Sequence, residues 1–110
     1  MHLLFNYAIN ALMNKPYTVE EIKTKVALTA RKYGIQKAYL FGSYARGDAG
    51  LESDIDICIE KGQIRTLLEF SGFCQDLEEM LEKKVDVITT VGIKNAFRNQ
   101  IEKDMVLIYG

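Results

Sequence analysis

The stretch "LFGSYARGDAGLESDIDICIE", residues 40–60, decides the fold, because it places a predicted strand on each side of a glycine–serine turn. Residues 53–60 alternate polar and apolar side chains, which predicts a strand with one buried face. Asp54 and Asp56 share the other face, with Cα atoms about 6.6 Å apart, and two carboxylates this close repel each other. A bound cation relieves that repulsion, and oxygen ligands of this kind suit Mg²⁺.

The turn before these acids has the composition of a phosphate-binding turn. Gly42 and Ser43 follow residues 37–41, a short apolar run that predicts a strand. Residues 43–46 predict a helical turn whose free N–H groups face incoming phosphates; glycine permits close approach of the backbone, and the serine hydroxyl adds a donor. Arg46 lies one helical turn later. It either binds phosphate or ties the following loop to the acidic cluster, and the sequence leaves both roles open.

A third carboxylate lies farther along the chain. Asp86 stands inside residues 85–89, "VDVIT", which predict another strand. If this strand is adjacent to the strand of Asp54 and Asp56, three carboxylates converge, as in sites that use two metal ions for phosphoryl or nucleotidyl transfer. Asp86 is then the candidate general base. The alternative is an acid at a strand end that faces water.

Segments with helical periodicity flank these strands. Thr18 and Glu21 predict a capping box for a helix over about 19–33, and Gly34 suits its C-terminal cap. Residues 3–13 predict a further helix within an N-terminal extension, residues 1–17. An apolar stripe predicts a helix over 64–81, interpreted as core, and it comprises Leu67, Phe70, Phe73, Cys74, Leu77, Met80 and Leu81.

The last elements are a predicted helix over 94–104 and a predicted edge strand over 105–109. The order of elements indicates an α+β (mixed α/β) fold in a single domain, residues 1–110, with one small mixed sheet flanked by helices. Whether Lys94 and Arg98 on the last helix face a ligand is open from the sequence.

Composition limits the functions of the chain. It is 48% hydrophobic and 26% charged with a net charge of −1, so it lacks the basic character that extended nucleic acid requires. Cys58 and Cys74 have no metal-like spacing, which indicates a reduced, cytoplasmic protein. The chain has no apolar run of the roughly 18 residues that a membrane span needs. Its one histidine, His2, lies at the terminus, which excludes histidine acid–base chemistry.

Several conspicuous residues have a plainer interpretation. Cys58 continues the face of Asp54 and Asp56, and it is interpreted as a small core residue. Lys61 and the pair Lys83–Lys84 are interpreted as solvated surface, with a contact to phosphate as the alternative.

The residues just described resemble a known family. Gly42 and Ser43, ten further residues and Asp54-Ile55-Asp56 are similar to the signature of the DNA polymerase beta-like nucleotidyltransferase superfamily. Ala45-Arg46-Gly47, Ser53 and the later "VDVIT" extend the likeness to its minimal nucleotidyltransferase family. The resemblance covers the chain from about residue 18 onward.

That resemblance implies a Mg²⁺-dependent enzyme that transfers a nucleoside monophosphate, AMP from ATP, to a hydroxyl. It implies two Mg²⁺ ions held by Asp54 and Asp56, with Asp86 on the ion nearer the nucleophile, and Gly42 and Ser43 on the β and γ phosphates. The minimal family is similar to MntA-type antitoxins, which adenylylate a tyrosine of a HEPN-family ribonuclease toxin. The expected partners are therefore ATP and such a toxin, and the oligomeric state is open.

Two other functions remain open from the sequence. The chain is alternatively a binding module that neutralises a partner by forming a complex, with an idle nucleotide site and residues 1–17 as apolar contact surface. It is alternatively a nucleotidyltransferase for a small molecule such as an aminoglycoside, although such enzymes usually carry an acceptor-binding domain that this chain lacks.

Overall fold

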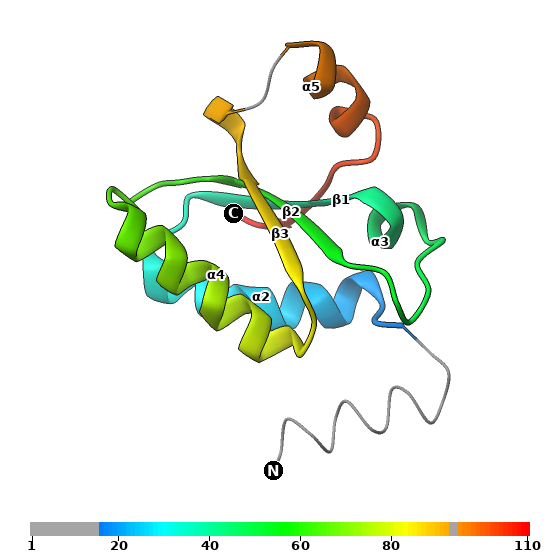
Figure 1. Cartoon of the computed structure of the whole chain (residues 1–110), viewed down its shortest axis with the longest axis horizontal. Helices are drawn as coiled ribbons and strands as arrows, with labels where there is room; N and C mark the ends of the chain where they lie inside the picture. The colour runs from blue at the N-terminus through cyan, green and yellow to red at the C-terminus, as the bar shows by residue number, and fades with distance from the viewer. Residues whose placement is uncertain (1–15, 93–94) are drawn as a thin grey trace.

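The computed structural model describes residues 16–92 and 95–110. Four strands form one sheet in the order β3-β2-β1-β4 (Figure 1). The inner strands are β1 (Lys37–Phe41) and β2 (Ile55–Glu60), which pair antiparallel. On the edges, β3 (Val85–Thr89) runs parallel to β2, and β4 (Val106–Tyr109) runs antiparallel to β1. The predicted mixed sheet and the predicted edge position of the last strand are both confirmed.

Two long helices cover one face of this sheet. α2 (Val19–Tyr33) and α4 (Leu67–Leu81) pack against each other on that face (Figure 1). α4 also forms the crossover that a parallel pair requires, because it connects β2 to β3. The capping box of α2 and its left-handed C-cap at Gly34, with φ 67°, are confirmed.

The α4 helix begins three residues later than predicted. A second capping box ends the loop there: Thr66 accepts a hydrogen bond from the Glu69 N–H at 3.1 Å, and the Glu69 carboxylate accepts one from the Thr66 N–H. Leu67 is therefore the first helical residue, and it is 80% exposed, so the prediction that it is a core residue is wrong. Leu68, the next residue of this first turn, is 84% exposed as well.

The core lies between the sheet and the two long helices. Ile55, Ile57 and Ile59 are fully buried, as their alternation predicted. The helical residues packed in the same core include Ile22, Val26, Phe73, Leu77 and Leu81. Cys58, predicted to be a core residue, is also fully buried.

The remaining short elements stand at the ends of the sheet. They are α3 (Gly42–Arg46), the 3₁₀ turn η1 (Thr90–Gly92) and α5 (Asn95–Glu102). β2 starts two residues later than predicted, because Gly50 and Ser53 bond to each other and close a turn ahead of the strand. α5 ends two residues earlier than predicted and β4 starts one residue later.

Some predictions fall outside the described residues. The helix over 3–13, most of the N-terminal extension, His2 and Lys94 lie there. In the described ranges, no helix has the length and apolar character needed to cross a membrane.

Candidate functional site

Two of the predicted site residues face each other across neighbouring strands. Asp56 on β2 is the register partner of Asp86 on β3. The pairing starts just before the strands, where the Ile55 N–H donates to the Lys84 carbonyl at 3.1 Å. Asp54 stands one residue before β2, at this same end of the sheet. The sheet thus brings together the three carboxylates that the sequence singled out.

Among the three carboxylates, Asp56 lies in the environment that most disfavours a negative charge. Its side chain is half-buried, whereas Asp86 is exposed. Burial raises the pKa of Asp56 above its usual 3.8, the Asp86 and Asp54 carboxylates raise it further, and the Arg46 guanidinium opposes the shift. The fold therefore holds a carboxylate where negative charge is unfavourable unless a cation shares the site.

Gly42 lies directly against Asp56. It has a positive φ of 73°, and a Cβ atom at this position would collide with the Asp56 Oδ2 atom. Glycine is therefore required here for its backbone conformation and for the space beside the carboxylate. Ser43 follows in the first turn of α3, and the buried Tyr44 anchors that short helix in the core. The glycine–serine turn and the acids thus form one site.

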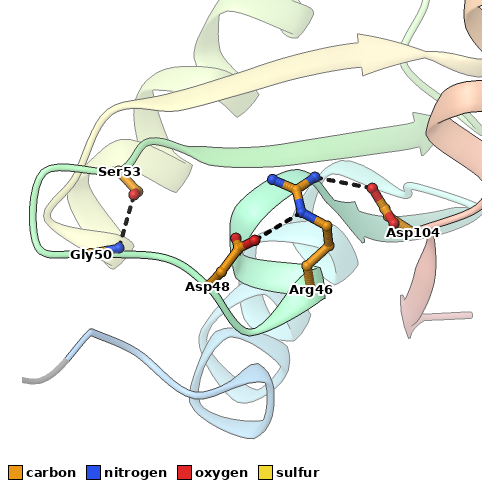
Figure 2. Close-up of polar contacts among 5 residues, drawn as sticks. All are labelled: Arg46, Asp48, Gly50, Ser53 and Asp104. Carbon is orange, nitrogen blue, oxygen red and sulfur yellow. Dashed lines mark hydrogen bonds and ion pairs between the residues drawn. The ribbon is translucent and has the colours of Figure 1, made fainter.

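Arg46 ties three parts of the chain together (Figure 2). Its Nε donates to Asp48 Oδ2 at 3.2 Å, and its Nη1 donates to Asp104 Oδ2 at 3.1 Å. Asp48 belongs to the loop between α3 and β2, and Asp104 stands shortly before β4. Arg46 thus ties the loop after α3 to the segment before β4, and its bonds do not reach the three acids as one of its two open roles required; phosphate binding stays a prediction.

One lysine of the pair before β3 differs from the prediction. Lys83 is half-buried and donates to the Leu51 carbonyl at 2.7 Å, so its interpretation as solvated surface is wrong. It fixes the loop that precedes the acids. Lys84 is exposed, and its Nζ lies 4.0 Å from Asp54 Oδ2. Lys61 is exposed, as predicted.

Arg98 forms a hydrogen bond at the other end of β3. Its Nη2 donates to the Thr90 carbonyl at 2.9 Å, which ties α5 to η1. No local pattern in the sequence predicts this contact or the contacts of Lys83 and Asp104, because their partners lie on other elements; Arg46 and Asp104 are 58 positions apart along the chain.

The donor set fits Mg²⁺ in chemistry. Carboxylate oxygens are its usual protein ligands, and one or two of them commonly share the ion with substrate phosphates. Within residues 16–92 and 95–110, no group of three or more acidic, histidine or cysteine side chains closes into a complete ligand cluster. The carboxylates therefore fit Mg²⁺ as donors, and the remaining ligand positions are left to water or to a phosphorylated substrate.

Most of the chain is similar to proteins of one known family. Residues 19–108 match the family described as "Nucleotidyltransferase domain". A protein of Methanocaldococcus jannaschii named "Putative protein adenylyltransferase MJ0435" is 39% identical over 88 residues, which cover 80% of this chain and 95% of the relative. "Protein adenylyltransferase MntA" of Thermococcus cleftensis is 32% identical over 97 residues, which cover 83% of this chain and 96% of the relative.

A solved structure has a similar fold. It is described as a toxin–antitoxin with AMP-PNP, and it superposes with a TM-score of 0.69 at 24% identity. The match covers 80% of this chain and 73% of that one.

Proposed function

This chain belongs to the nucleotidyltransferase domain family, and on that premise we propose that it transfers AMP from ATP to a hydroxyl of a partner protein. The observation that carries the proposal is the pairing of Asp56 with Asp86, with Gly42 directly against Asp56. A turn suited to phosphates and a group of carboxylates suited to Mg²⁺ thereby share one site.

The site residues divide into two groups. Asp54, Asp56 and Asp86 are the ligands proposed for two Mg²⁺ ions, and Asp86 would hold the ion nearer the attacking hydroxyl. When bound, these ions promote deprotonation of the attacking hydroxyl and neutralise charge on the phosphates. Gly42 and Ser43 are proposed to hold the β and γ phosphates, Gly42 by close approach of its backbone and Ser43 through its hydroxyl.

The reaction needs one proton acceptor and one leaving group. The acceptor oxygen attacks the α phosphorus of ATP and forms a new P–O bond. The bond between the α phosphorus and the oxygen that bridges it to the β phosphate breaks, and pyrophosphate leaves with that electron pair. Asp86 receives the proton of the attacking hydroxyl. It is more exposed than its partner Asp56 and is therefore more accessible to an acceptor.

The acceptor is proposed to be a tyrosine of a HEPN-family toxin. The relative from Thermococcus cleftensis is named a protein adenylyltransferase, and this chain covers nearly all of its length. The fold is shared with a protein described as a toxin–antitoxin. With the resemblance to MntA-type antitoxins, these names favour a protein acceptor over an aminoglycoside.

The test uses ATP labelled at the α phosphate. The purified protein is incubated with Mg²⁺, labelled ATP and an extract of its native cells, in parallel with the double variant Asp54→Asn/Asp56→Asn. The matched control is Asp76→Asn, which makes the same carboxylate-to-amide change on α4, where Asp76 pairs with Lys32 and not with the site.

We expect label on one protein, at a tyrosine located by mass spectrometry, with wild type and with D76N. The double variant should transfer none while keeping the circular dichroism spectrum of the folded protein. Transfer by the double variant at the wild-type rate would overturn the mechanism. ATP binding without label on any protein or small molecule would favour a binding module that neutralises its partner by complex formation.

A further inference from the structure

A lysine completes the acidic end of the sheet. Asp54 stands one residue before β2, and Lys84 stands one residue before β3. The two strands are parallel and in register, with Ile55 opposite Val85 and Asp56 opposite Asp86. Residues two positions apart along extended backbone share a face, so Lys84 has the same relation to Asp86 as Asp54 has to Asp56. The result is a two-by-two array of three carboxylates and one ammonium.

Lys84 lies closest to one of these carboxylates. Its Nζ is 4.0 Å from Asp54 Oδ2, and the two side chains are 69% and 43% exposed. Among the described residues, this is the one ion pair that reaches Asp54, Asp56 or Asp86. The other nearby cation, Arg46, is already bound to Asp48 and Asp104. Lys84 is thus the side chain that offsets the negative charge at Asp54.

We propose that Lys84 is a positioning residue that holds Asp54 until a divalent cation binds, and that the cation then displaces its ammonium. This exchange rests on the proposed metal-dependent function. An ammonium and a divalent ion cannot both stay close to Asp54 without repelling each other, so binding of one weakens binding of the other. The long, flexible lysine stem lets the ammonium move into water, where its hydration compensates for the lost pair.

The exchange predicts that removing the ammonium tightens metal binding. Binding of Mn²⁺, as a stand-in for Mg²⁺, is measured by electron paramagnetic resonance of the free ion, at low salt and without nucleotide. Lys84→Gln should bind Mn²⁺ about two- to fivefold more tightly than wild type, the range that an exposed ion pair can supply. The charge control is Lys23→Gln, since Lys23 is exposed on α2. It should bind as wild type does.

Two further variants separate positioning from general charge. Lys84→Arg keeps the cation, so its Mn²⁺ affinity should stay near that of wild type. In an Asp54→Asn background, Lys84→Gln should no longer tighten binding, because the residue it acts through is gone. This double-mutant cycle is a readout that a merely structural role for Lys84 would not move.

Each result has a distinct meaning. If wild type binds Mn²⁺ and Lys84→Gln binds no more tightly, or if the tightening persists unchanged without Asp54, the exchange is overturned and the proposed function stands. If wild type binds no more Mn²⁺ than Asp54→Asn/Asp56→Asn, both the exchange and the proposed metal site are overturned.

Discussion

Asp56 and Asp86 lie opposite each other on parallel strands, each the other's nearest neighbour across the ladder. The connection through α4 fixes this relationship, because it returns the chain to the same end of the sheet before β3 begins. Two carboxylates brought together in this way weaken the fold when both are ionised. The metal-binding role proposed for this pair therefore opposes the stability of the fold, and the opposition can be measured.

Asp56→Asn should raise the melting temperature at pH 7, by roughly 2–5 °C in EDTA. The pKa of Asp56 in the fold lies above its usual 3.8, so its ionised form is disfavoured by folding. The penalty is absent below pH 3.8 and fully present once the pH exceeds the folded value. The gain should therefore disappear as the pH falls below about 4.

Asp76→Asn is a control in which the melting temperature should change in the opposite direction. Hydrogen bonds from Tyr33 and Lys32 lower the pKa of Asp76, so its ionised form stabilises the fold above the unfolded pKa. This variant should melt lower than wild type at pH 7. A lower melting temperature for both variants would contradict the strain assigned to Asp56.

Gly42→Ala should cost about 1–3 kcal/mol of folding free energy and abolish transfer. Its positive φ disfavours any side chain, and the added Cβ would displace the Asp56 carboxylate. Urea denaturation and the labelling assay measure the two effects. Gly50→Ala is the matched control, because nothing lies within 4 Å of its added Cβ, and it should behave as wild type.

Asp104→Asn should raise the KM for ATP by less than about tenfold and change kcat less. The substitution removes one of the two carboxylates that hold Arg46, which should let the loop after α3 move. Asp48→Asn removes the other. The double variant should have a higher KM for ATP than either single variant. An unchanged KM in all three would show that the bonds of Arg46 do not position the nucleotide site.

Lys83→Met should loosen the loop that precedes the acids. Its ammonium donates to the Leu51 carbonyl, and methionine cannot replace that bond. Hydrogen exchange should accelerate at the amides of residues 48–53 and remain unchanged in α2. Lys61→Met, a change of the same kind at an exposed lysine, should leave exchange in the loop unaffected; equal acceleration in both variants would contradict the anchor.

The elements of the fold could be predicted from the sequence because each carries a local pattern. Alternating isoleucines mark β2, and the pair Thr18 and Glu21 marks the start of α2. The apolar stripe predicts the start of α4 three residues too early, because apolar residues continue past the true boundary. The capping pair Thr66 and Glu69 sets that boundary.

Only part of the candidate site could be predicted from the sequence. Gly42, Asp54 and Asp56 could be recognised because a strand and a turn place them close in sequence as well as in space. The neighbourhood of Asp86 followed from the family resemblance, and the register confirms it. The contacts of Arg46 with Asp104 and of Lys83 with Leu51 could not be predicted, since they join distant segments through exposed polar side chains that carry no periodicity.

Asp104 and β4 are synthesised after every other part of the site, yet they stabilise β1 and the turn that follows it. β4 pairs with β1, and Asp104 holds Arg46 of the turn that follows β1. A nascent chain that has reached only β3 already contains the three aspartates, but one edge of β1 and one bond of Arg46 are still open. The complete arrangement of the candidate site therefore forms only after residue 109 has been synthesised, later than the three aspartates themselves.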